Sequence, residues 1–70
     1  MTLAELAEYT VRLIEILSIK DDHHRDVRLA NLMTDLETAY SIPMLIDEKY
    51  NEENQLIIGF YRMVSNLRRF

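Results

Sequence analysis

The stretch QLIIGFYRMV, residues 55–64, decides the fold of this chain. It has helical composition and is apolar on nearly every side, and only Gly59 and Arg62 interrupt it. A helix that is apolar most of the way round has to be covered on more than one face. The rest of the 70-residue chain therefore has to supply that cover.

Length and composition predict one small all-α domain over residues 1–70. A chain of this size buries only about 60% of the surface that it exposes when unfolded, so it is marginal as a monomer. Apolar residues make up 49% of the chain, and glycine and proline occur once each. Few turn residues and many helix formers predict helices. We expect a three-helix bundle that is completed by oligomerisation.

Several classes of protein are disfavoured by the same composition. Cysteine is absent, which excludes a disulfide and a thiolate zinc site. Glu5 and Glu8 interrupt the first apolar residues, so no secretion signal is expected there, and no run reaches the roughly 18 apolar residues of a membrane span. We therefore expect a cytoplasmic protein that does not enter a membrane. Twelve acids against eight bases also disfavour nucleic acid as a partner.

The first helix is expected over residues 2–18. Thr2 and Glu5 have the spacing of a capping box, in which each side chain accepts a hydrogen bond from the backbone N–H of the other. Its apolar residues cover more than one stripe, so the helix has side chains left for a second contact. The expected core stripe is Leu3, Leu6, Ala7, Thr10, Leu13, Ile14 and Leu17, and the apolar residues beside it are Tyr9, Val11 and Ile16.

The second helix is expected over residues 22–40, with Asp21 or Asp22 as its N-cap. Pro43 disfavours helical backbone in the residue before it, so this helix should end shortly before the proline. The helix is amphipathic, with one side facing the core. Its expected core stripe is Leu29, Leu32, Met33, Leu36, Ala39 and Tyr40.

Two alternatives are open for residues 42–50. In the first, Ser41 caps a short fourth helix that has Pro43 in its first turn, where the missing N–H costs nothing. In the second, the segment begins as an extended linker, and Asp47 or Asn51 caps the last helix. We prefer the linker.

The last helix is expected over residues 47–69, with a kink allowed near residues 51–54. Acids at its start and arginines at its end suit the helix dipole. Two flanking helices cover about two of its faces and leave an apolar edge open. One stripe is Tyr50, Ile57, Phe60, Tyr61, Val64 and Leu67, a second is Leu56, Met63 and Phe70, and Ile58 lies off both.

This excess of apolar surface predicts a protein interface. Gly59 costs about 1 kcal/mol relative to alanine inside a helix, and close approach by another helix is one reason to keep it. A chain this short also gains from further burial. We expect a homodimer or a larger protein partner. The expected interface residues are Leu56, Ile58, Gly59 and Met63 of the last helix, with Tyr9 and Ile16 of the first.

No catalytic, metal or cofactor site is predicted. His23 and His24 are adjacent, so on a helix they point about 100° apart and do not share one ion. The carboxylates lie on solvated helix faces or at helix starts, and the one glycine lies inside an apolar run instead of in a phosphate-binding loop. We therefore expect neither an enzyme nor a small-molecule substrate.

The C-terminal arginines provide an alternative. Arg62, Arg68 and Arg69, with Tyr61 and Phe70, form a basic and aromatic cluster that suits an anionic partner. The same arginines also complement a helix dipole. The leading prediction is a small non-enzymatic regulatory, inhibitor or adaptor protein of bacterial or phage type. The alternative is a nucleic-acid-associated dimer that uses these arginines.

Overall fold

The structure is a computed structural model that describes residues 1–45 and 47–68. Within these residues the chain forms helices and no strand, which confirms the all-α prediction. The four helices are α1 (Leu3–Leu17), α2 (Asp22–Tyr40), α3 (Glu48–Glu53) and α4 (Gln55–Leu67).

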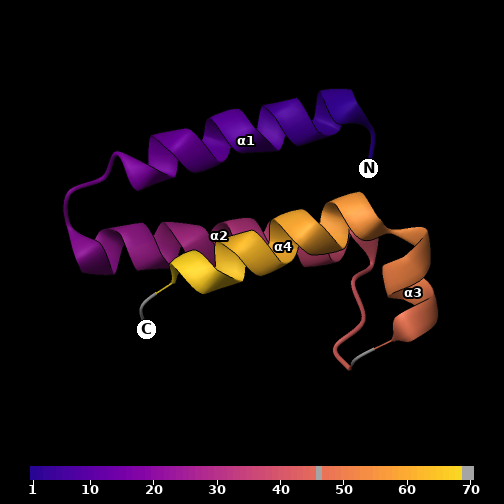
Figure 1. Cartoon of the computed structure of the whole chain (residues 1–70). Helices are drawn as coiled ribbons and strands as arrows, with labels where there is room; N and C mark the ends of the chain where they lie inside the picture. The colour runs from indigo at the N-terminus through magenta and orange to yellow at the C-terminus, as the bar shows by residue number, and fades with distance from the viewer. Residues whose placement is uncertain (46, 69–70) are drawn as a thin grey trace.

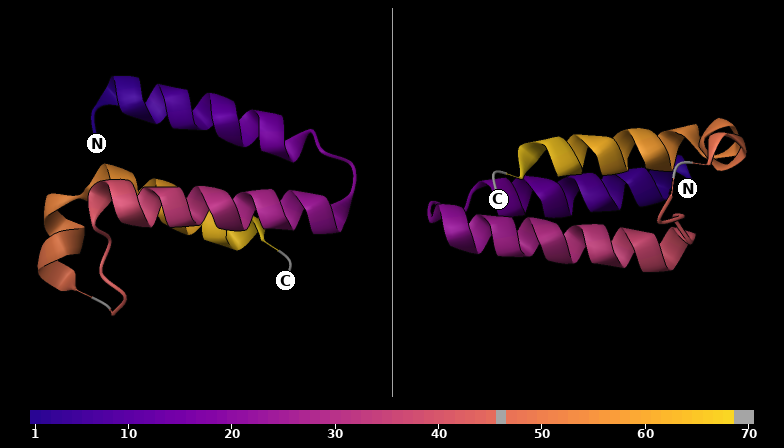
Figure 2. Two further views of the ribbon diagram at one scale, coloured as in Figure 1. Left: turned by 180° about the vertical axis from the view of Figure 1, so that it is seen from behind. Right: turned by 90° about the horizontal axis from the view of Figure 1, so that it is seen from below.

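Helices α1, α2 and α4 lie alongside one another, and the short α3 lies across one end of them (Figures 1 and 2). Helices α1 and α4 run in the same direction, and α2 runs opposite to both. Helix α2 contacts both of the other long helices, whereas α1 and α4 contact each other less. The centre of the fold is therefore one side of α2.

Side-chain caps set the starts of three helices. The N–H of Thr2 donates to Oε1 of Glu5 at 2.8 Å, and the N–H of Glu5 donates to Oγ1 of Thr2 at 3.1 Å, which confirms the capping box. Asp21 is the N-cap of α2, and its carboxylate accepts the backbone N–H three residues later at 3.0 Å. Asp47 does the same for α3, also at 3.0 Å.

Helix α2 ends shortly before Pro43, as predicted. Its C-cap, Ser41, has a φ of 53°, in the left-handed region, and its N–H donates to the carbonyl of Glu37. Residues 42–45 are not helical, so the linker alternative describes this segment. The short fourth helix exists, but it begins only after Asp47.

The last helical region is two helices instead of the one helix predicted over residues 47–69, and the break falls within residues 51–54, where a kink was allowed. Asn54, with φ −132° and ψ 46°, interrupts the helical backbone between α3 and α4. Its Nδ2 donates to the carbonyl of Tyr50 at 2.9 Å, and such local bonds compete with helix continuation. The hydroxyl of Tyr50 donates to the carbonyl of Tyr40 at 2.5 Å, so α3 is held at the end of α2.

The core lies between the three long helices. Leu29, Leu32 and Leu36 of α2 have no exposed surface. Full burial of each such side chain contributes about 1.5–3 kcal/mol relative to exposure. The other buried apolar residues are Met33 of α2, Leu13 and Ile16 of α1, and Ile57, Ile58, Phe60 and Val64 of α4.

Helix α1 is rotated relative to its predicted stripe. Ile16 is 3% exposed and Tyr9 packs against the core, whereas Leu3 and Ile14, both expected inside, are 73% and 61% exposed. Leu17 and Ala7 are exposed as well. The predicted stripe is therefore wrong for these four residues and confirmed for Leu6, Thr10 and Leu13, which lie inside.

Long-range contacts explain this rotation. The ring of Tyr9 lies 6.0 Å from that of Tyr40 and 6.4 Å from that of Phe60, so Tyr9 faces α2 and α4 at once. Nη2 of Arg12 pairs with Oδ2 of Asp35 at 2.6 Å, which turns that side of α1 toward α2. The opposite side of α1 is left facing solvent.

Smaller corrections concern α2 and α4. Ala39, expected in the core stripe, is exposed, and Leu67 at the end of α4 is 37% exposed. Ile58, expected to lie uncovered, is only 9% exposed. Ile42 and Pro43 border the same hollow as Ile58, so the linker covers a side of α4 that two flanking helices do not reach.

Leu32→Ala should lower the free energy of unfolding by about 2–5 kcal/mol, because it removes a fully buried side chain and leaves a cavity in the shared core. Urea unfolding followed by far-UV circular dichroism measures this change. Arg28→Ala, at an exposed position of the same helix, is the control and should stay within about 0.5 kcal/mol of wild type. Equal losses in the two variants would contradict the assigned core.

Glu5 should make a pH-dependent contribution to stability. Hydrogen bonds from the backbone N–H of Thr2, and then from its side chain, lower the pKa of the Glu5 carboxyl below its ordinary 4.5. A group whose pKa is lowered by folding stabilises the fold above its unfolded pKa, and this contribution is lost as pH falls through the lowered value. Below pH 4.5 the unfolding midpoint of Glu5→Gln should therefore fall less steeply than that of wild type. Glu8→Gln, at an exposed position of α1, is the control, and an unchanged slope in Glu5→Gln would refute the prediction.

Candidate protein interface

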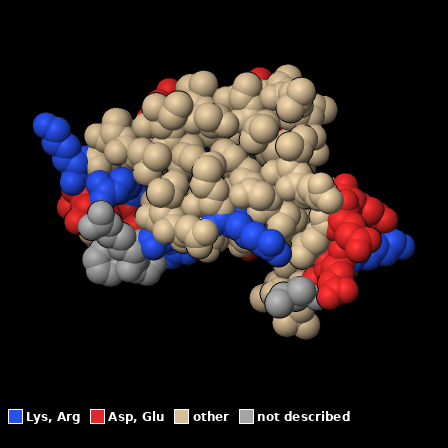
Figure 3. Space-filling model, in the orientation of Figure 1, with Lys and Arg blue, Asp and Glu red and all other residues tan. Residues whose placement is uncertain are grey.

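An exposed apolar face runs along α1 and α4 on one side of the molecule. Figure 3 looks onto these two helices and shows uncharged atoms that continue from one helix to the other, with acidic atoms confined to the edges. We call this surface the α1/α4 face. Its residues are Leu3, Ala7, Val11, Ile14 and Leu17 of α1 and Leu56, Gly59, Met63 and Leu67 of α4.

Helical spacing and the core contacts place these residues together. On α4 the four residues recur at intervals of three and four, so they form one line along the helix. Phe60 lies beside this line and turns inward against Tyr9, so the line borders α1. On α1 the exposed residues Leu3, Ile14 and Leu17 lie across the helix from Arg12, which pairs with α2, so they are on the side of α1 that is turned away from α2.

The face gathers most of the large exposed apolar side chains of the described residues. Seven of them are between 37% and 73% exposed. The largest apolar patch of a soluble monomer is often a site of interaction. The face is therefore our candidate functional site.

The structure brings half of the predicted interface residues to this face. Leu56 and Met63 are 46% and 44% exposed, and Gly59 lies between them. The other three residues are inside the chain: Tyr9 is half-buried between two aromatic rings, and Ile16 and Ile58 belong to the core.

Sequence reasoning missed the half of the face that α1 supplies. Leu3, Ile14 and Leu17 were assigned to the core, because periodicity shows that a helix has a wide apolar side but not which part of it is covered. The width of this apolar side did indicate an exposed part, because α1 has more apolar side chains than one core-facing stripe can hold.

Gly59 has no role that the described part of the chain explains. It does not have a positive φ, and a Cβ added to it would meet nothing within 4 Å. The close approach predicted from its presence is therefore not made by another helix of this chain. For an external partner it stays a prediction.

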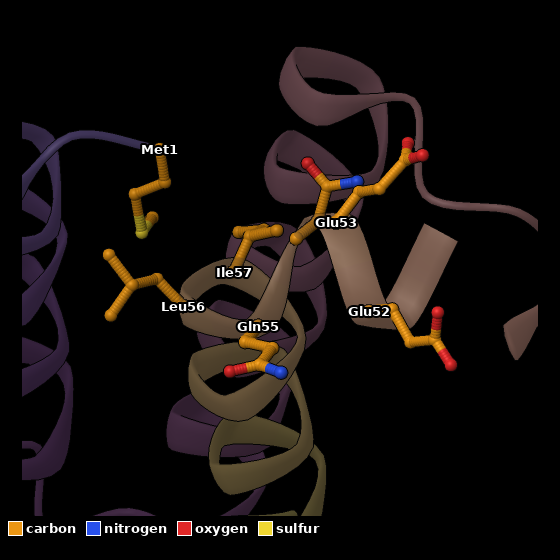
Figure 4. Close-up of a pocket in the computed structure, with 7 residues that line it drawn as sticks. Met1, Glu52, Glu53, Gln55, Leu56 and Ile57 are labelled. Carbon is orange, nitrogen blue, oxygen red and sulfur yellow. The ribbon is translucent and has the colours of Figure 1, made fainter. Parts of the chain in front are cut away.

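A hollow of about 250 Å³ lies at one end of the face, where α3 meets α4. Figure 4 shows Met1 and Leu56 pointing toward each other on one side of it, while Glu52 and Glu53 direct their carboxylates away from them. Two further hollows measure about 170 and 210 Å³. All three are smaller than the roughly 300–1,000 Å³ that small-molecule sites occupy.

The described residues bring together only part of the predicted arginine cluster, since Tyr61 borders the same hollow as Arg62. Arg62 borders the 170 Å³ hollow beside the linker. Arg68 borders the 210 Å³ hollow beside α2, and its Nη1 lies 3.7 Å from Sδ of Met33. The two side chains thus border different hollows, and Arg69 and Phe70 lie outside the described residues.

Among residues 1–45 and 47–68, no three His, Asp or Glu side chains are placed to hold a metal ion. None of the helices described here is long and apolar enough to cross a membrane. Comparison with protein-family models, with curated proteins and with solved structures finds no match. The α1/α4 face is therefore the feature from which a function is inferred.

Gly59→Ala should raise the free energy of unfolding of the single chain by about 0.5–1 kcal/mol. Alanine is the better helix former, and its Cβ enters open space. Urea unfolding of dilute protein, at a concentration where sedimentation shows single chains, measures the change. A loss of stability under these conditions would show that a neighbour in the same chain already occupies that space.

Proposed function

We propose that this protein is a small, non-enzymatic helical module that acts by protein–protein contact through the α1/α4 face. The observation that supports the proposal is the exposed apolar surface shared by two helices whose other sides form the core. A chain of 70 residues is short of buried area, and covering this face with another protein adds some.

In this proposal the three long helices form a bundle that association completes. Helices α1 and α4 contact each other less than either contacts α2, so the side of the molecule away from α2 is the less closely joined. A partner that contacts both helices covers Ile14 of α1 and Met63 of α4 together, and it thereby links the two helices. Association then stabilises the fold as well as the complex.

A regulatory, inhibitor or adaptor role suits such a surface best. The face offers apolar side chains and few polar groups. It therefore suits binding through shape complementarity and burial of apolar surface, and not through hydrogen bonds or ion pairs. The small hollows agree with this choice, because none has the volume of a typical small-molecule site.

Ile14→Glu tests the proposal by placing a charge on the face, and Val27→Glu is its matched control. Val27 is also a large exposed apolar side chain, 44% exposed, but it lies on α2 and is not part of the face. Ile14→Glu should weaken association by roughly tenfold or more, whereas Val27→Glu should leave it unchanged. Circular dichroism should show that both variants keep wild-type helix content.

Two measurements distinguish a second copy of the chain from a different protein as the partner. Sedimentation velocity of the purified chain reports self-association, and capture from an extract of the host with mass-spectrometric identification reports other proteins. If the wild-type chain sediments at 8.3 kDa at high micromolar concentration and captures nothing that Ile14→Glu loses, the proposed function is wrong.

A further inference from the structure

We infer that a second copy of this chain occupies the α1/α4 face, with the two α4 helices antiparallel and Met63 of each copy over Gly59 of the other. This inference rests on the proposed function and names the partner of that same face. It follows from the order of residues along α4, from the space at Gly59 and from the distribution of charge.

The line of residues on α4 is complementary to itself. Gly59 and Met63 are four residues apart, one without a side chain and the other with a long flexible one that is 44% exposed. A twofold axis midway between them places each Met63 over Gly59 of the partner, so a single operation makes both contacts. The same axis brings Leu56 of each copy near Leu67 of the other. Such mutual contacts define an isologous interface.

The free space at Gly59 provides the hole that this arrangement needs. A Cβ at this position would meet nothing within 4 Å, so the helix surface is open there toward solvent. A missing side chain lets two helix backbones approach closely, and a long side chain of one helix can then fill the gap in the other. In the single chain the same glycine only weakens the helix.

The charges of the chain also permit a second copy at this face. The net charge is −4, so two copies repel each other wherever their acids meet. Glu8 and Glu15 lie one helical turn from Val11, at the outer edge of the face on α1, and none of the residues of the line on α4 is acidic. Arg62 lies outside the line on α4 and stays in the solvated rim, where charged groups are common.

A second copy draws on both helices of the face. Seven large apolar side chains on each copy are between 37% and 73% exposed, and a standard interface takes roughly 800 Å² from each partner. The apolar residues of α1 flank the two α4 helices in this arrangement and contribute to the contact. A second copy therefore covers the surface that the single chain leaves open.

Disulfide trapping tests the geometry directly, because the chain contains no cysteine. The probes are two single variants, Gly59→Cys and Met63→Cys, oxidised separately and as an equal mixture. A disulfide needs Cα atoms within about 7 Å, which the antiparallel pair provides only between position 59 of one copy and position 63 of the other. The mixture should therefore give roughly tenfold more crosslinked dimer than either variant alone.

Controls separate this geometry from other forms of association. Val27→Cys, mixed with either variant, should give only background crosslinking. Efficient crosslinking of each variant with itself would indicate parallel helices and overturn the inference. Gly59→Leu should stay folded, because its side chain enters open space, but it fills the hole for Met63 and should weaken dimerisation by roughly tenfold or more.

These experiments distinguish a failure of the inferred dimer from a failure of the proposed function. A single 8.3 kDa chain at high micromolar concentration, without specific crosslinking, overturns the inference of a second copy. If such a chain still captures another protein and Ile14→Glu abolishes the capture, the proposed function stands with a different partner. If capture is also unaffected, both are wrong.

Discussion

The structure depends on the burial of three leucines on one side of α2. Leu29, Leu32 and Leu36 have no exposed surface, and their spacing places them along one line of the helix. Both α1 and α4 pack mainly on α2, and they contact each other less. A single central helix in so short a chain can cover only one side of each neighbour. The apolar residues on the far sides of α1 and α4 are therefore left to solvent.

Contacts of three tyrosines determine which apolar side chains of α1 are buried and which are exposed. The ring of Tyr9 packs against Tyr40 and Phe60, and the hydroxyl of Tyr50 holds the carbonyl of Tyr40. Burial, together with the nearby Glu5 carboxylate, raises the pKa of Tyr40 to about 12, so its phenol stays neutral at physiological pH. Because Tyr9 is held inside, α1 is rotated and exposes Ile14. The exposed apolar surface of α1 is thus a consequence of the packing of Tyr9 in the core.

The contrast between local and long-range features explains what the sequence could predict. The capping box of Thr2, the cap at Asp21 and the helix end before Pro43 depend on residues within one turn, and all three were predicted. The rotation of α1 depends on Tyr40 and Phe60, which are far away in sequence, so periodicity alone could not set it. Leu56 and Met63 were found because α4 has more apolar sides than its neighbours can cover, whereas the matching residues of α1 were assigned to the core.

A kink was allowed near residues 51–54, but the full break at Asn54 was not predicted, for a physical reason. Acids at residues 47, 48, 52 and 53 suit the start of one long helix as well as the start of a short one, so charge did not distinguish the two. The break depends instead on the bond from Asn54 to the carbonyl of Tyr50 and on the attachment of Tyr50 to α2. With α3 held there, the preceding linker lies against Ile58 and removes it from the surface.

The association proposed for the α1/α4 face has an energetic cost as well as a gain. Covering apolar surface contributes roughly 25 cal/mol per Å², but buried area in a complex does not convert directly into affinity. Loss of translational and rotational freedom costs about 4–15 kcal/mol, so only a modest surplus remains as affinity. In the proposed complex the leucines of α2 stay buried whether or not the face is covered. The core therefore supplies the fold, and the uncovered sides of α1 and α4 are left for the proposed contact.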